Sequence, residues 1–511
     1  MKKIYTNRIA GIIVLLLCFY SCHNKTTSED KYRPLIHFSS GKNWTGEPSG
    51  LVYSDGEYHL FYLHNPSDAV LGNIDWGHAV SRDLVKWEEL PVAIPADASG
   101  QIYSGSVIVD SQNTSGLGSD TTSPFIAFFT YQNDKGNPDR PVYMAYSLDK
   151  GLSWTKPEAP IIEDNQYQQL YNPNVSWNEN LNTWLMTVST GSTIRFYSSS
   201  DCRHWTYLST FGEGLFSEGN WESSSFFPLQ ITDSEQTKWV LTVTMNGGPA
   251  DGAPGIRYFV GDFNGTTFKI TQTQELWADY GKDHCAGITL NQAPGKKTVM
   301  LSWMNSWDYA NLLPTQQGRG SLTFPRTLSL KAEGNYYILA SRPVEAINNY
   351  IRNTYSSEEK IKYTGERKIF SNIPFPKEPF ILKLSFDNTN RRAIWGARDY
   401  GIRFITASGK QISIGYQAEL NSFYIDRSQL REHSFSENFD RLVGATYSHY
   451  GLATDWYILA DHNSVELFAC ENRVALTALS FPEEPFVAFE LYSDQGNTTL
   501  LDASLSLLKD K

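Results

Sequence analysis

Cysteine is scarce in this chain, since its 511 residues include five cysteines and only Cys202, Cys285 and Cys470 follow residue 22. Small domains that depend on disulfides carry dense cysteine patterns, so the sequence predicts no disulfide framework. The cysteines and histidines also lack the close spacing of zinc ligands. No complete glycine-rich dinucleotide fingerprint follows a strand and opens a helix. We therefore expect neither a metal ion nor an organic cofactor.

Positive charge is in short supply as well. The chain has 43 lysines and arginines against 55 aspartates and glutamates, which gives a formal net charge of −12, and no basic run stands out. Nucleic-acid binding draws much of its affinity from cations that neutralise phosphates. The composition therefore argues against a nucleic-acid partner.

Hydrophobic runs long enough to cross a membrane are also missing. The apolar stretch Ile9–Tyr20 follows Lys2 and Lys3, and it is shorter than the roughly 20 residues that a membrane-spanning helix needs. This pattern predicts a signal peptide over residues 1–22. Cys22 ends a segment similar to a bacterial lipobox, so we expect its acylation, a polar tether over residues 23–31, and a lipid anchor in the membrane; ordinary signal cleavage nearby is the alternative. The protein would then be an exported lipoprotein of the bacterial cell envelope, at the periplasmic face or the cell surface.

Aromatic side chains, in contrast, are abundant. The chain contains 14 tryptophans and 29 tyrosines, and 41% of its residues are hydrophobic, a composition typical of globular proteins. Tryptophan and tyrosine rings stack on sugars, and their N–H and O–H groups bond polar atoms. The composition therefore favours a neutral ligand rich in hydroxyl groups, such as a carbohydrate.

A degenerate repeat organises the first part of the chain. Short turn segments end in an aromatic residue, namely Trp87, Trp154, Trp205 and, more weakly, Phe268. The first three contain a serine and an aspartate, and the fourth has glycine, aspartate and asparagine instead. Each follows an aromatic, alternating strand, and the spacing of roughly 50–70 residues suits one four-stranded sheet per repeat. We interpret the repeats as propeller blades whose closing aromatics pack between neighbouring sheets; the alternative is a series of ordinary hairpins.

The sequence changes character near Pro343. Short alternating runs such as 380–386 and 465–468 then follow one another, separated by turn residues. This is the pattern of a β-sandwich. A large chain of this length is expected to form two domains.

One motif carries the chemistry. The segment Trp44-Thr45-Gly46-Glu47-Pro48-Ser49-Gly50 places a carboxylate on a tight turn that enters an aromatic strand. It resembles the N-terminal signature of glycoside hydrolase family 32, the invertases, inulinases and levanases, which reads Trp-Met-Asn-Asp-Pro-Asn-Gly and whose Asp is the nucleophile. The resemblance continues in the family's order through segments 76–78, 103–106, 221–222, 303–307 and 461–468.

The resemblance implies an all-β fold, with a five-bladed β-propeller over residues 32–340 followed by a C-terminal β-sandwich over residues 341–511. It also implies hydrolysis of β-fructosides such as levan, inulin or fructo-oligosaccharides with retention of configuration. Retaining hydrolysis needs a nucleophilic carboxylate and a protonated carboxylic acid about 5–5.5 Å apart. In this family the acid belongs to a Trp-Glu-Cys segment, which here reads Trp221-Glu222-Ser223, so Glu222 is the expected acid/base; a solvated glutamate at a strand end is the alternative.

Glu47 departs from the family by one methylene group. Misplacement of a reacting group on the order of 1 Å can cost about a hundredfold in rate. Three interpretations remain: a shifted nucleophile that works on a slightly different sugar, a residue that only bonds ligand hydroxyls, and a solvated turn residue.

Asn172 replaces the third acid of the family, the Asp of an Arg-Asp-Pro segment, and Tyr171 replaces the Arg. The amide can still bond sugar hydroxyls, but it lacks the negative charge that stabilises a developing cation. The change also removes a like charge that would help to keep Glu222 protonated. Both effects predict weaker catalysis, with binding less affected.

Further positions match the sugar pocket of the family. Trp44 and Trp76 would be stacking walls, and His64 stands near the position of a family Gln. The other expected substrate contacts are Tyr103, Ser104, Asp283 and Trp303. For each aromatic residue, packing between blades is the alternative, and it is favoured for Trp87, Trp154 and Trp205.

Two functions follow from this pattern. The first is a lipid-anchored fructan hydrolase with low or redirected activity. The second is a surface protein that binds fructans and has lost catalysis, because two of the three acid positions differ from the family.

Overall fold

The computed structural model describes residues 31–132, 140–163, 170–215, 220–357, 360–387, 396–440, 442–446 and 453–509. In this part the chain forms strands β1 to β31 and two short 3-10 helices, η1 (Ala310–Leu312) and η2 (Glu345–Tyr350). No helix within these residues is long and apolar enough to cross a membrane. Cys22, the predicted signal peptide and the tether up to residue 30 lie outside the described residues.

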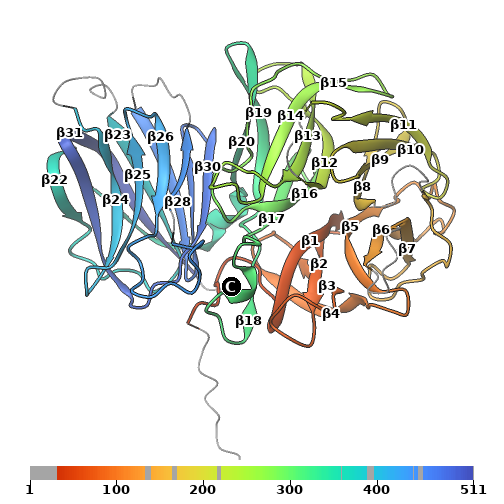
Figure 1. Ribbon diagram of the computed structural model, residues 1–511, viewed down its shortest axis with the longest axis horizontal. Coiled ribbons are helices and arrows are strands. Elements are labelled where there is room, and N and C mark those ends of the chain that lie inside the picture. The colour runs from red at the N-terminus through yellow and green to blue at the C-terminus, as the bar shows by residue number, and fades with distance from the viewer. Residues whose placement is uncertain are drawn as a thin grey trace, which may run out of the picture.

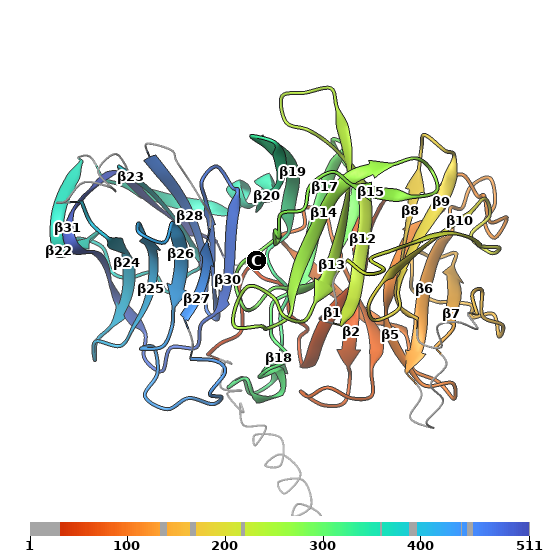
Figure 2. The same ribbon diagram turned by 45° about the horizontal axis from the view of Figure 1, so that its top comes forward.

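Five sheets form the blades of a propeller, which occupies the red-to-green part of Figures 1 and 2. The five-bladed propeller expected from the family resemblance is therefore confirmed. Blade 1 contains β1 (Asn43–Ser54), β2 (Glu57–Asn65), β3 (Asp75–Ser81) and β4 (Trp87–Ile94), with β18 (Gly318–Arg319) parallel to β1; blade 2 contains β5 (Gln101–Val109), β6 (Phe125–Gln132) and β7 (Val142–Ser147); blade 3 contains β8 (Tyr171–Asn178), β9 (Thr183–Ser189), β10 (Ile194–Ser199) and β11 (Thr206–Phe211); blade 4 contains β12 (Trp221–Gln230), β13 (Thr237–Met245), β14 (Gly255–Phe263) and β15 (Phe268–Ile270); blade 5 contains β16 (Cys285–Ala293), β17 (Lys297–Trp303), β19 (Arg326–Glu333) and β20 (Tyr336–Pro343).

The first strand of each blade lines the propeller axis. β1 contacts β5, β5 contacts β8, β8 contacts β12, β12 contacts β16, and β16 closes the ring against β1. These strands are covered on both faces by neighbouring blades, so nine consecutive residues of β1 are buried. The ring brings five strand starts together around one axis.

The repeated serine–aspartate segments form the turns after β3, β7 and β10. In the first, the Asp83 carboxylate accepts backbone N–H groups of the turn, and the Trp87 indole N–H donates to Leu84 O over 3.1 Å. The same indole-to-carbonyl bond joins Trp154 to Gly151 and Trp205 to Cys202. The three residues whose carbonyl groups accept these bonds all have a positive φ, which tightens the turn.

Three of the four closing aromatic residues pack between blades, as the repeat predicts, whereas Trp87 meets Phe38 of the segment before β1. Trp154 meets Phe61 of blade 1 edge-on at 5.6 Å, and Trp205 meets Phe128 of blade 2 edge-on at 5.8 Å. Phe268 lies 5.3 Å from Phe211 of blade 3. The weak fourth repeat therefore has the same structural role as the stronger ones.

The C-terminal part is a β-sandwich built around one long strand, β31 (Phe486–Leu508), which pairs with β24 in its first half and with β23 in its second half. This strand joins the two layers into one hydrogen-bonded sheet. The remaining strands are β21 (Ile351–Ser356), β22 (Ile361–Ile369), β23 (Phe380–Asp387), β24 (Asp399–Thr406), β25 (Gln411–Gln417), β26 (Ser422–Asp426), β27 (Leu442–Thr446), β28 (Ala453–Asp461), β29 (Ser464–Ala469) and β30 (Val474–Leu479).

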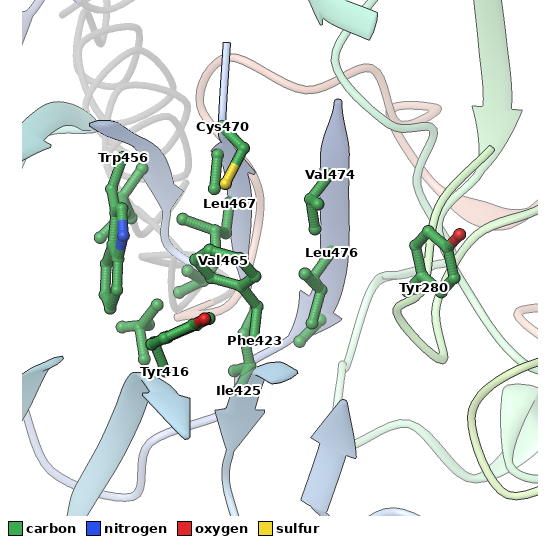
Figure 3. Close-up of a cluster of buried hydrophobic side chains, with 14 of the residues drawn as sticks. Tyr280, Tyr416, Phe423, Ile425, Trp456, Val465, Leu467, Cys470, Val474 and Leu476 are labelled. Carbon is green, nitrogen blue, oxygen red and sulfur yellow. The ribbon is translucent and has the colours of Figure 1, made fainter. Parts of the chain in front are cut away.

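The two layers enclose a hydrophobic core that Figure 3 shows. Phe423 and Ile425 of β26 face Trp456 of β28 and Leu467 of β29 across it. Tyr280 of the propeller approaches this cluster beyond β30, and its backbone N–H donates to Ala475 O. β20 continues to Pro343, so blade 5 extends past the domain boundary predicted after residue 340.

Buried charges join the propeller to the sandwich. Arg326 of β19 bonds Asp279 of the propeller and Glu466 of β29, each over 2.7 Å. His37 lies between Glu466 and Asp461 of the sandwich, at 2.9 and 2.8 Å. All five side chains are buried. The blades and the sandwich are thus held in a fixed relation.

Candidate active site

The five innermost strands share a bulge near their starts. In blade 1, three steps along β1 from Thr45 to Pro48 oppose two steps along β2 from His64 to Tyr62. Such a bulge changes the direction in which side chains point, and it is common beside active sites. The same extra residue occurs in the intervals Ile102–Gly105, Tyr171–Asn174, Trp221–Ser224 and Cys285–Ile288.

The bulges hold the polar residues that the sequence singles out. Glu47, Ser104, Asn172 and Glu222 each lie inside one of them, on four different blades. Side chains of neighbouring bulges bond directly: Ser104 to Glu47, and Asn172 to Ser223. The bulges therefore meet at one end of the propeller axis, and sequence patterns alone did not indicate them.

Glu47 is a buried carboxyl group, with only 3% of the residue exposed. Its Oε2 accepts a hydrogen bond from Ser104 Oγ over 2.8 Å. Burial, followed by the negative charge of Glu222, raises the pKa of Glu47 to about 8, although the bond from Ser104 opposes the shift. A solvated turn residue is inconsistent with this burial.

Glu222 is half-buried on β12, and its Oε1 accepts a hydrogen bond from Asn220 Nδ2 over 3.0 Å. Burial raises its pKa, whereas Asn220 and the positive charge of Arg140 lower it. The half-buried Tyr103 and the buried Cys285 also feel the charges of both Glu47 and Glu222. The two carboxyl groups therefore share one electrostatic environment.

A proton held by this pair favours Glu47. Glu47 is buried more deeply than Glu222 and lacks the favourable influence of Arg140 on its ionised form. Two coupled carboxyl groups release their protons in two steps that belong to the pair. The surroundings therefore oppose ionisation more strongly at Glu47 than at Glu222.

Asn172 is a buried residue with a left-handed backbone conformation, at φ 48°. Asparagine tolerates this conformation better than most residues. Its Nδ2 donates to Ser223 Oγ over 2.7 Å, while its Oδ1 has no hydrogen-bond partner among the described residues. A ligand hydroxyl could satisfy this buried acceptor.

Arg140 is a site residue that the sequence reasoning missed. Its guanidinium group lies 5.5 Å from the ring centre of Tyr103 and 5.0 Å from that of Tyr171, which are cation–π distances. Its charge acts on Glu222. Arg140 is isolated in a loop, so no motif could have identified it.

Three tryptophans form a cluster beside the start of β1. Trp44 and Trp303 are fully buried, with ring centres 5.7 Å apart, and Trp303 Nε1 donates to Thr45 O. Trp307 stacks on Trp44 at 6.3 Å and is 36% exposed. Trp307 is therefore the exposed member of the cluster, whereas Trp44 and Trp303, which the family resemblance indicated, are covered.

Trp76 and His64 support the site from behind. Trp76 is fully buried and donates its indole N–H to the carbonyl of Tyr103 over 3.0 Å. His64 Nδ1 lies 2.7 Å from the carbonyl oxygen of Trp44. These contacts fix the backbone next to the bulges of β5 and β1.

Asp283 lies apart from the glutamate pair. Its fully buried carboxylate bonds Arg427 of the sandwich over 2.7 Å, the backbone N–H of Leu479 over 2.8 Å, and the hydroxyl of Tyr309. This residue holds the two domains together, so we leave it out of the sugar site. Among the described residues, no group of three His, Cys, Asp or Glu side chains is placed to hold a metal ion.

Comparisons with known proteins place this chain in a family. The chain matches the glycosyl hydrolases family 32 N-terminal domain over residues 37–343 and the glycosyl hydrolases family 32 C terminal over residues 355–507. The levanase of Bacillus subtilis (strain 168) is 32% identical over 524 residues, which cover 100% of this chain and 75% of the levanase. An extracellular exo-inulinase of Aspergillus niger is 32% identical over 518 residues, which cover 92% of this chain and 93% of that protein.

Solved structures agree with the sequence matches. The exo-inulinase from Aspergillus awamori has a TM-score of 0.85 and 31% identity, over 94% of this chain and 98% of that chain. A fructofuranosidase from Schwanniomyces occidentalis complexed with fructose has a TM-score of 0.82 and 28% identity, over 94% of this chain and 99% of that chain. The protein is therefore a member of glycosyl hydrolase family 32.

Proposed function

We propose that this protein hydrolyses β-fructosidic bonds of levan, inulin or fructo-oligosaccharides. The observation that carries the proposal is the pair Glu47 and Glu222, which lie in equivalent bulges on two blades and are electrostatically coupled. The levanase and exo-inulinase relatives support a fructan as the substrate.

In the proposed mechanism, Glu222 donates a proton to the glycosidic oxygen while the Glu47 carboxylate attacks the anomeric carbon. The leaving sugar departs as an alcohol, and the fructosyl group becomes an ester of Glu47. Glu222, now ionised, takes a proton from water as the water oxygen attacks the anomeric carbon of this ester, the bond from that carbon to Glu47 breaks, and fructose and the Glu47 carboxylate are released. Asn172 Oδ1 would accept a hydroxyl of the bound sugar.

The activity is expected to be low. The productive arrangement needs Glu47 ionised and Glu222 protonated, whereas the environments of the two groups favour the reverse. Asn172 also supplies no negative charge to stabilise a developing oxocarbenium ion. Both features reduce the rate without removing any ligand contact.

Incubation of the purified protein with levan, inulin and sucrose tests the proposal. We expect slow release of fructose, its loss in Glu222→Gln, and β-fructofuranose as the first anomer seen by NMR. Turnover of about 10 per second, typical of enzymes, would contradict the expectation of low activity. Initial release of the α anomer would contradict retention.

The second candidate function is fructan binding without catalysis. It is favoured by the unpartnered Oδ1 of Asn172, which suits a ligand hydroxyl but not acid catalysis. Calorimetry with fructo-oligosaccharides would then show binding without product. Hydrolysis without any heat of binding would eliminate this candidate.

We also propose that the protein is exported and acylated at Cys22. The charged and apolar N-terminal sequence supports a signal peptide. Metabolic labelling with a radioactive fatty acid should mark the wild-type protein but not Cys22→Ser. Equal labelling of both would overturn the anchor.

A further inference from the structure

A cavity of about 300 Å³ opens at the other end of the innermost strands. It is lined by residues 51–53 of β1, 107–109 of β5, 175–177 of β8 and 289–290 of β16. On each of these strands the lining residues follow the bulge. The cavity therefore lies on the far side of the ring from the glutamate pair.

The two ends of the axis are separate. At about 3.3 Å per residue, Val52 lies roughly 15 Å along β1 from Glu47. Ser49 of β1 and Ser106 of β5 are buried between these levels, and Ser106 Oγ accepts the backbone N–H of Val175 on β8. Buried side chains of the packed strands thus lie between the cavity and the glutamate pair.

The lining of this cavity suits a sugar. Tyr53 is 37% exposed and packs against Tyr58 at 4.8 Å, and the half-buried Trp177 is held edge-on by Trp184 at 4.9 Å. Ser111 and Gln112 add a hydroxyl and an amide from the loop after β5. None of the described residues that line the cavity is charged, although the chain carries a net charge of −12.

We propose that this cavity is a second carbohydrate site, which binds one or two units of a neutral oligosaccharide. Its volume is at the lower end of the roughly 300–1,000 Å³ of ligand pockets, and supported aromatic rings with nearby hydroxyl and amide groups match sugar recognition. The assignment of the sugar as a fructan rests on the proposed function. A second site would hold a polymer and raise the effective concentration of its chain ends at the glutamate pair.

Calorimetry on the full-length Glu222→Gln protein tests the proposal with levan-type and inulin-type oligosaccharides. Two variants address the cavity: Tyr53→Ala removes an aromatic wall, and Ser111→Trp fills the mouth from an exposed loop position. The matched control is Tyr207→Ala, because Tyr207 is 47% exposed on β11, at the outer edge of blade 3. Melting curves verify that all three variants fold.

We expect two binding events per chain, of which one is weakened at least tenfold by Tyr53→Ala and by Ser111→Trp but not by the control. With Glu222 restored, both variants should lower kcat/KM severalfold on polymeric levan and leave it unchanged on a trisaccharide. A single event that the cavity variants do not affect overturns the second site. A single binding event that both cavity variants weaken supports the second site and counts against the proposed function. The absence of any binding rejects both the second site and the proposed function.

Discussion

Ser104 donates its hydroxyl to Oε2 of Glu47 over 2.8 Å, and this bond links the bulges of two neighbouring blades. The bond favours the ionised form of Glu47 against burial and against the charge of Glu222. Ser104 therefore supports the one protonation state in which Glu47 can act as a nucleophile.

Ser104→Ala should lower kcat/KM by about tenfold or more, since a hydrogen bond to a charged group contributes about 1.5–3 kcal/mol. Loss of the bond raises the pKa of Glu47, so the descending limb of the pH profile should move to higher pH. Initial rates on levan across pH 4–10 measure both effects. Ser106→Ala removes a buried hydroxyl from the same strand without contact to Glu47 and should leave the limb in place.

Asn172→Asp should raise kcat by about tenfold, which corresponds to about 1.4 kcal/mol of transition-state stabilisation. The new carboxylate would stabilise a developing cation and, as a like charge, favour protonation of Glu222. Aspartate tolerates the left-handed backbone at this position. Steady-state kinetics on inulin and levan measure the change, with Asn172→Ala as the control that has neither the carboxylate nor the amide. Equal activity of the Asp and Ala variants would show that position 172 has no electrostatic role.

Glu47→Asp tests the extra methylene directly. If the extra methylene of Glu47 displaces the nucleophile, the shorter Asp should restore its position. The double variant Glu47→Asp with Asn172→Asp should then have a higher kcat than either single variant. Rates for the two single variants and the double variant form a cycle, and strict additivity would show that the two positions act independently.

The sequence predicted propeller blades because a turn that ends in an aromatic residue recurs four times, and three of these aromatic residues pack between blades. The number of blades, five, came from the family resemblance. The glutamates were found because each stands in a local motif. The bulges were not found, since an extra residue is visible only against the paired strand. Asp283 was assigned to the sugar from the family resemblance, and its bond to Arg427, 144 residues away, could not be read from the sequence. Arg140 likewise meets Tyr103 and Tyr171 only in the folded chain.

Arg140→Met should move the ascending limb of the pH profile to higher pH. Burial raises the pKa of Glu222, and Arg140 opposes that shift, so loss of the positive charge leaves the pKa higher. We assign this limb to the ionisation of Glu222, because Glu222 is the less buried carboxyl group of the pair. Arg140→Lys keeps the charge and should leave the limb near its original position. An unmoved limb in Arg140→Met would remove Arg140 from the electrostatics of the site.

Glu466→Gln should lower the free energy of unfolding by about 3–5 kcal/mol, because it leaves the buried Arg326 without one of its two carboxylate partners. Burial opposes ionisation of Glu466, but Arg326 and His37 outweigh it and lower its pKa to about 2. A carboxylate whose pKa is lowered by folding stabilises the folded state at pH values above its pKa in the unfolded chain, which is about 4.3. The contribution of Glu466 is then lost as the pH falls toward 2, so the difference in the free energy of unfolding between wild type and variant should shrink between pH 5 and pH 2.

Urea unfolding at several pH values measures this difference. The control is Glu345→Gln, because the ion pairs of Glu345 with Lys297 and Arg342 are exposed and should contribute less than about 1 kcal/mol. Equal destabilisation by both variants would mean that the buried network does not hold the domains together.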